Sequence, residues 1–195
     1  RALQIVERGA EASPRALSAL AAHAEGVGLR AEAAALHARS AAQAVAGGSY
    51  DLAAGAATRA LSLAVDLASS LVLELLELLV VIGERTASLP DLAEELPLVL
   101  GSVDAQGEPE LSRRARVLCA RALAATGATE SAEVVLAQIE PTDAPVHELS
   151  LAKLSVALSS GDVRRALELV DELDPARVAL DERALLLLAD LYSRA

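Results

Sequence analysis

Apolar residues recur along this chain at intervals of three and four, in blocks separated by glycine, proline and polar residues. The block that opens at Ser49-Tyr50-Asp51 illustrates the pattern, with apolar residues at Leu52, Ala53, Ala56, Ala60, Leu61 and Leu63. This spacing places one apolar stripe along a helix. Strong helix formers fill the blocks, and runs of β-branched residues are nearly absent. The pattern therefore predicts an all-α protein.

In the first half of the chain, the pattern predicts a series of helices with clear start signals. Ser13-Pro14 is one, because serine caps a helix N-terminus and proline suits the first turn. The expected helices span about 14–25, 29–46, 49–65 and 66–82, the last ending at Gly83, and they follow a short helix that stops at Gly9. Ser88-Leu89-Pro90-Asp91 is typical of a further start, and Pro97 should end or kink that helix.

Residues 101–109 form the longest polar, turn-rich stretch and are the predicted connection between two parts of the array. We expect irregular helical repeats over 1–100 and regular ones over 110–195, within one continuous solenoid. The regular part should contain helices at about 110–125, 129–139, 145–159, 163–173 and 181–194. Asp143, Asp162 and Asp181 are suitable N-caps for the last three of these helices.

The second half of the chain contains the same unit twice. Gly127 and Gly161 are 34 residues apart, and the same separation recurs for three further pairs: Ala132 with Ala166, Ile139 with Leu173, and Pro141 with Pro175. A fixed period in this range is typical of stacked helix–turn–helix repeats.

Composition and charge exclude several classes of partner. The net charge is −11 and the pI about 4.7, which argues against nucleic acid and against an anionic membrane surface. The most apolar run, residues 71–82, is too short to span a bilayer and carries two glutamates. Cys119 is the single cysteine, so no intrachain disulfide can form and a reducing cytoplasmic compartment is expected.

The repeats resemble the tetratricopeptide (TPR) family, in which small residues and a turn glycine recur at fixed places in each helix pair. Three sets of residues carry the resemblance: Ala41, Gly48, Tyr50, Ala53 and Ala60; Ala120, Gly127, Ala132 and Pro141; Gly161, Ala166 and Pro175. Leu154, Ile139 and Leu173 depart from it, because small residues are usual at those places. The resemblance implies a right-handed superhelix (α-solenoid) of antiparallel helix pairs that binds other proteins.

Residues 20–34, 39–44 and 47–51 resemble the start of helical arms in large bacterial signalling proteins. These are STAND-type ATPases, LuxR-type regulators and kinase–ATPase fusions. The resemblance implies a sensor arm whose catalytic domains lie elsewhere in a longer polypeptide. The chain begins without methionine and stops within a helical pattern, so we expect it to be a piece of such a protein.

Two motifs that suggest chemistry have a structural interpretation that we prefer. Gly26-Val-Gly-Leu-Arg-Ala31 matches a dinucleotide fingerprint, but the fingerprint needs a preceding strand and a helix is predicted there. His147-Glu148 begins like a zinc-protease motif, but Leu151 occupies the position of the second histidine. No P-loop precedes Lys153, the single lysine.

The remaining candidates for catalysis are carboxylates and the thiol. Glu74 and Glu77 share a helix face and could act as an acid–base pair, although a solvated stripe is the simpler interpretation. Cys119 lies where the repeat would bury it, which favours a structural thiol over a nucleophile. We expect no enzyme activity, no cofactor and no metal site.

The concave groove of such an array would be lined by the first helix of each pair. Counting back from the turn glycines, the groove-facing candidates are Arg39, Arg114, Val117, Arg121, Glu148, Leu151 and Ser155. Arg114 and Arg121 lie seven residues apart on one face and could hold a partner's carboxylate. Alternatively, they are ordinary surface arginines that pair with Glu108 or Glu110.

These observations predict a non-catalytic protein-interaction or regulatory module, with a protein, a peptide or other domains of the parent chain as partner. Two alternatives fit the same features. An engineered or generated helical scaffold would explain the restricted alphabet, in which Phe, Met, Trp and Asn do not occur, although a very GC-rich genome also favours most of it. A small-ligand sensor arm would show a closed apolar cavity in place of an open groove.

Overall fold

The protein is all-α in its computed structural model, which describes residues 12–64, 69–86, 96–139, 146–173, 175–179 and 181–194. No strand occurs among these residues. The helices are α2 (Pro14–Gly26), α3 (Arg30–Ala46), α4 (Tyr50–Ala64), α5 (Ser69–Thr86), α6 (Leu96–Ala105), α7 (Pro109–Ala125), α8 (Thr129–Ala137), α9 (Val146–Ser160), α10 (Val163–Val170), α11 (Pro175–Val178) and α12 (Glu182–Arg194).

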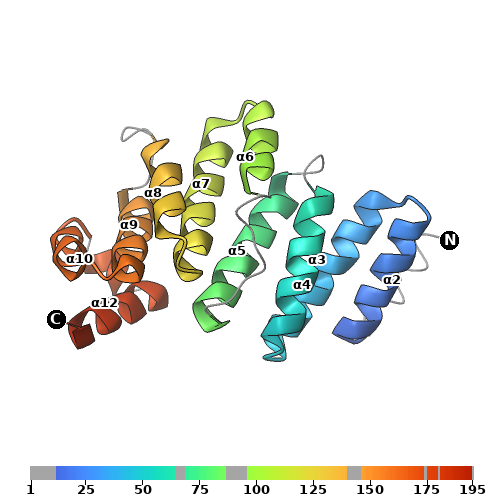
Figure 1. Cartoon of the computed structure of the whole chain (residues 1–195), viewed down its shortest axis with the longest axis horizontal. Helices are drawn as coiled ribbons and strands as arrows, with labels where there is room; N and C mark the ends of the chain where they lie inside the picture. Colours follow the sequence, from blue (N-terminus) through green and yellow to red (C-terminus); the bar gives the residue numbers. More distant parts are fainter. Residues whose placement is uncertain are drawn as a thin grey trace.

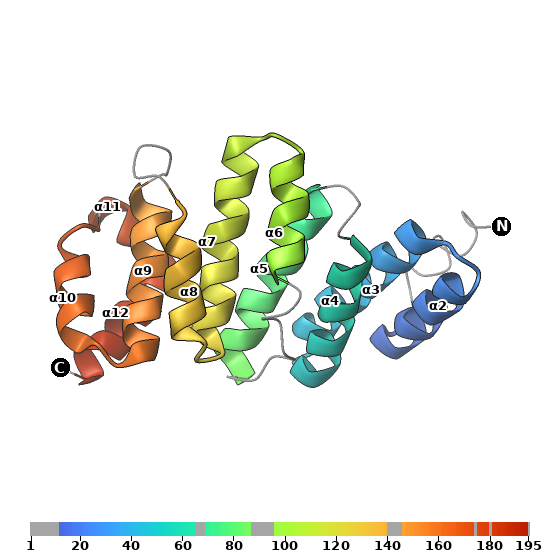
Figure 2. The ribbon, with the colours of Figure 1, turned by 45° about the horizontal axis from the view of Figure 1, so that its top comes forward.

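The helices stand side by side in an elongated row, with α2 at one end and α10 and α12 at the other (Figures 1 and 2). A first set of helices, α3, α5, α7, α9 and α12, forms contacts from each member to the next. A second set, α4, α6, α8 and α10, packs on the first set, while its members contact each other little or not at all. The first set is therefore a continuous layer, and spaces can open between helices of the second set.

Local signals explain where the helices begin. The Ser13 side chain accepts a hydrogen bond from the Ala16 amide at 3.4 Å, and Pro14 is the first residue of α2. Asp162 accepts from the Arg165 amide at 3.0 Å, and Asp181 from the Ala184 amide at 3.3 Å. These three predicted caps are confirmed, whereas Asp143 lies outside the described residues. Gly9 and Ser88-Leu89-Pro90-Asp91 lie outside them as well.

Two glycines of the 34-residue period are required by backbone geometry. Gly127 follows α7 with a φ of 80°, and Gly161 follows α9 with a φ of 77°. A side chain would crowd the backbone in this left-handed region, so glycine is favoured there. Glycine therefore recurs at this interval because the chain makes the same kind of turn after α7 and after α9.

Helix boundaries differ from the prediction around residues 83–109. Gly83 does not end a helix, because α5 continues through it to Thr86. The expected loop at 101–109 is mostly helical, since α6 reaches Ala105 and only 106–108 connect it to α7. Burial explains this, because α6 packs its residues Leu96, Val99, Leu100 and Val103 into the core. Pro97 lies in the first turn of α6, where proline is tolerated.

The core changes character along the row. Between α3 and α4 it consists largely of alanine on alanine, and Ala41, Ala53, Ala57 and Ala60 are all fully buried. Such small side chains allow two helices to approach closely. From α5 onward leucine and valine are more frequent in the core, and one continuous cluster joins α3 and α4 to α7, α8 and α9. A smaller cluster holds α9, α10 and α12 together. Within the described residues, no helix is long and apolar enough to cross a bilayer.

Candidate interaction surface

Arg114 and Arg121 both bind carboxylates, but the carboxylates belong to this chain. Arg114 Nη2 donates to Glu77 Oε1 at 2.6 Å, and Arg121 Nη2 donates to Glu84 Oε1 at 2.8 Å. Both pairs join α7 to α5. The predicted pairing with Glu108 or Glu110 is not what forms, because Glu110 pairs with Arg113 one turn along α7. The two arginines are therefore engaged in holding neighbouring helices of the first set together.

Val117 and Leu151 are buried between helices and were predicted to face a groove. Each is only 5% exposed. Val117 packs with Ile139, Leu149 and Ala152 in the space where α7 meets α9, and Leu151 packs with α10 and α12. These residues are 34 positions apart, so the repeat places both at the interface with the next helix pair. The prediction counted residues back from the turn glycines and assigned both side chains to the groove face of their helices, whereas both lie on a buried face.

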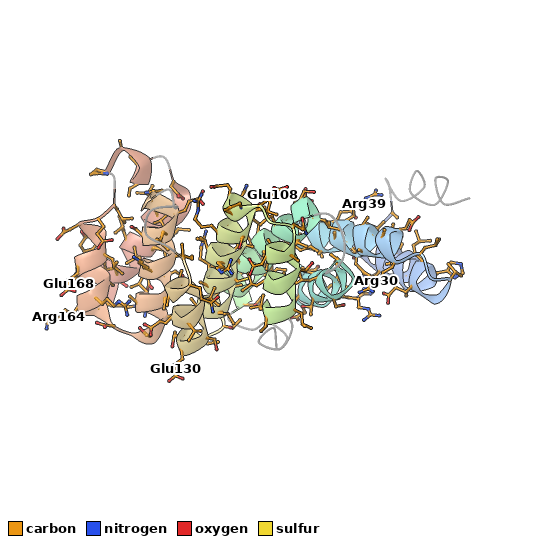
Figure 3. All side chains as sticks on the ribbon, turned by 90° about the horizontal axis from the view of Figure 1, so that it is seen from above. Arg30, Arg39, Glu108, Glu130, Arg164 and Glu168 are labelled. Atoms are coloured by element: carbon orange, nitrogen blue, oxygen red, sulfur yellow. The ribbon has the colours of Figure 1, made fainter. Side chains whose placement is uncertain are left out.

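The other three predicted contact residues occupy different environments. Glu148 is exposed near the start of α9, and Ser155 lies two turns further along with 8% of its surface exposed. Arg39 lies on α3, toward the N-terminal end of the row (Figure 3). Ser155 lines a groove, and Arg121 donates to Glu84, which is another residue of the same lining.

This groove, which we call the α5–α12 groove, has a volume of about 500 Å³ and is formed by four helices of the first set, α5, α7, α9 and α12. Its apolar lining comes from Val81, Leu158, Leu186 and Leu187, and its polar lining from Glu84, Arg85, Ser155, Ser159, Asp190 and Arg194. Leu186 is 58% exposed, so apolar surface is open to solvent here. An apolar floor with a few placed polar groups is typical of a ligand site.

Three of the four charged side chains at the groove are held by contacts within the protein. Arg194 Nη2 lies 2.7 Å from Asp190 Oδ2, and its Nη1 donates to the Leu158 carbonyl at 2.9 Å. On the opposite side, Glu84 is held by Arg121. The lining carries two acidic and two basic side chains, and so is neutral in a chain of net charge −11. A partner would meet ordered charges with little net repulsion.

The other features that suggested chemistry in the sequence are a cysteine, a histidine and a glycine motif, and the structure shows the surroundings of each. Cys119 is fully buried, and burial raises the pKa of its thiol to about 12, so it is no nucleophile. His147 Nε2 lies 3.6 Å from Asp181 Oδ2, which is beyond a hydrogen bond. The predicted fingerprint at 26–31 joins α2 to α3, so a helix precedes it. No group of three metal-binding side chains occurs in the part of the chain that the structure describes.

Sequence reasoning missed the pairing of Glu77 and Glu84 with the two arginines, and it missed the α12 side of the groove. One signal was available, because Glu77 and Glu84 have the same seven-residue spacing as Arg114 and Arg121. Asp190 and Arg194 had no comparable signal, since only the packing of α12 on α9 brings them to the groove. No protein-family model, curated protein or solved structure matches this chain. The packed helices are compatible with a helical repeat.

Proposed function

We propose that this chain is a non-catalytic protein-interaction module that binds a peptide segment of its partner in the α5–α12 groove. In this proposal the helices form a right-handed superhelix of antiparallel pairs of the TPR kind. The observation that carries it is the groove itself, in which four successive helices of the first set combine an exposed apolar floor with charges held in place.

The size and openness of the groove favour a peptide over a small metabolite. Its volume of about 500 Å³ falls within the usual range for binding sites, but it is open and bordered by the exposed Leu186. A side chain of an extended or helical segment could bury that apolar surface. Carbonyls and amides of the segment could then meet Arg85, Ser159 and Asp190 around the floor.

The wider role we propose is regulatory, as the helical arm of a larger bacterial signalling protein in the cytoplasm. Support comes from the sequence resemblance over residues 20–51 and from the 34-residue repeat. The partner would be another protein or another domain of the parent chain. The acidic surface makes a basic or neutral partner easier to accommodate than a nucleic acid or an anionic membrane.

The test fills the groove and leaves the rest of the surface unchanged. Ser159→Trp places a large side chain in the α5–α12 groove, and Ser70→Trp places the same side chain on an exposed site of α5 outside it. Native and variant chains with equal helicity are used as bait in a lysate of a GC-rich bacterium. We expect a protein that native and Ser70→Trp chains retain and Ser159→Trp loses.

Two other outcomes would contradict the proposal. Equal retention of a protein by all three baits would place the interaction outside this groove. A small molecule that copurifies with the native chain and is displaced by Ser159→Trp would identify a ligand sensor in place of a peptide-binding module.

A further inference from the structure

A second groove lies between α8, α9 and α10, on the side of the second set of helices. It has a volume of about 280 Å³, and we call it the α8–α10 groove. Its lining residues are Glu133, Leu136, Ala137, Ile139, Leu149, Lys153, Val156 and Arg165. The groove exists because α8 and α10 both pack on α9 without closing against each other.

Lys153 is the most unusual residue in the α8–α10 groove. It is the single lysine of the chain, and it is only partly exposed. Leu149, Lys153 and Val156 follow one another at spacings of four and three, so they share one face of α9. Lys153 therefore lies between two buried aliphatic residues on this face, Leu149 at 8% and Val156 at 2% exposure.

The charge of Lys153 is not balanced within the groove. Arg165 Nη1 lies 2.8 Å from Glu133 Oε1, so these two charges satisfy each other. Lys153 has no ion-pair or hydrogen-bond partner among the residues described. The lining thus has a net charge of +1, from one acidic and two basic side chains, in a chain of net charge −11. By contrast, the α5–α12 groove is neutral.

An ammonium without an ion-pair partner can gain a charge-assisted hydrogen bond from a ligand that brings a carboxylate. The chain has 28 acidic residues, but no carboxylate among the described residues pairs with Lys153. Apolar surface also remains in the groove, since Ile139, Leu149 and Val156 form a buried floor while Leu136 is half-buried and Ala137 is exposed beside it. One ligand would engage both the ammonium and this surface if it carried a carboxylate next to an aliphatic side chain.

We propose that the α8–α10 groove binds an acidic–aliphatic peptide segment, with a Glu or Asp carboxylate on Lys153 and a neighbouring Leu, Ile or Val side chain over Ile139, Leu149 and Val156. This site is separate from the α5–α12 groove and does not depend on the function proposed for it. A nucleic-acid backbone is a poor ligand here, because one ammonium cannot offset repulsion by the acidic chain.

The single lysine makes a direct test practical. Lysine labelled with ¹³C at Cε gives one lysine resonance in the full chain, and it reports on Lys153 alone. The probe is a blocked peptide, acetyl-Leu-Glu-Leu-Leu-amide, and its counterpart with Gln in place of Glu. We expect the Glu peptide to shift the resonance saturably and to bind about tenfold or more tightly than the Gln peptide.

Two variants move the affinity in opposite directions. Lys153→Gln should weaken binding of the Glu peptide about tenfold or more, measured by calorimetry. Glu133→Gln raises the charge of the groove and should strengthen it, which damage to the fold would not do. Arg164→Gln is the control, because Arg164 is exposed on α10, points away from the body of the protein and does not line the groove (Figure 3).

Four results would overturn the proposal. The first is equal binding of the Glu and Gln peptides, and the second is no saturable shift of the lysine resonance. The third is an affinity that Lys153→Gln and Glu133→Gln leave unchanged. Loss of binding in Ser159→Trp with retention in Lys153→Gln would place the peptide in the α5–α12 groove and would also reject this site.

Discussion

Arg121 on α7 binds Glu84 on α5 at 2.8 Å, and Arg114 repeats this relationship with Glu77 two turns earlier at 2.6 Å. In both pairs the arginine follows its glutamate by 37 residues. The two ion pairs differ in their exposure to solvent, since the Arg121 side chain is 11% exposed and that of Arg114 is 51% exposed. The same chemical contact should therefore contribute differently to stability at the two positions.

Arg121→Ala should lower the free energy of unfolding by about 1–2 kcal/mol, because it removes a partly desolvated ion pair and the packing of a buried aliphatic stem. Arg114→Ala should change it by about 0.5 kcal/mol or less, since both partners are well exposed and solvent screens the pair. Urea unfolding followed by circular dichroism measures both. Equal losses would show that burial does not distinguish the two ion pairs.

Substitution of glycine by alanine should have opposite effects at two sites. Gly127→Ala should destabilise the protein by about 1 kcal/mol, because its φ of 80° disfavours any side chain. Gly55→Ala should stabilise it by up to about 1 kcal/mol, because Gly55 is exposed within α4 and a Cβ there meets nothing within 4 Å. Thermal unfolding of the two variants gives the sign directly. A gain at Gly127 would contradict the turn geometry.

Stability should depend on pH through Glu25. Hydrogen bonds from Arg59, and also from His37, hold the pKa of Glu25 below its ordinary value of 4.5. The charged carboxylate therefore stabilises the folded state above pH 4.5, and this contribution is lost as pH falls through the lowered pKa. Arg59→Gln should be less stable than the native chain at about pH 6, with a smaller difference at about pH 3. A difference that grows in acid would reverse the expected sign.

Cys119 should react only in the unfolded chain. Its sulfur is buried and its pKa is raised to about 12, so thiolate and access are both lacking in the folded state. We expect labelling by a thiol reagent at neutral pH to follow the urea transition seen by circular dichroism. Ser159→Cys adds an exposed thiol and should react at once without urea. Rapid labelling of native Cys119 would show that α7 opens locally.

The helices were predictable wherever an apolar stripe began or ended at a residue that caps or terminates helices. Ser13-Pro14, Gly48 and Gly127 set ends of helices close to the predicted bounds. Gly83 and Gly101 misled the prediction, because both lie inside helices that tertiary packing maintains. Glycine lowers helix propensity by only about 1 kcal/mol, and the burial of Val80, Ile82, Val99 and Val103 exceeds that cost.

The candidate site was less predictable than the helices. Arg114 and Arg121 were found as a pair on one face, but their partners are 37 residues away in sequence and belong to a different helix. The place of Lys153 beside Glu133 and Arg165 in one groove was not apparent either, since a lysine at a helical position is ordinary until its neighbours are known. Contacts between elements depend on how the helices are stacked, and the periodicity of one helix does not contain that information.

The contacts along the row have a mechanical consequence. Each helix is held by its near neighbours, and no contact joins α2 or α3 to α10 or α12 beyond the weakest pairs among the described helices. A load applied to the two ends would therefore be shared as small rotations at every interface in turn. The molecule should behave as an elastic rod that lengthens before any helix unwinds, and a partner bound across the α5–α12 groove would stiffen the section that it spans.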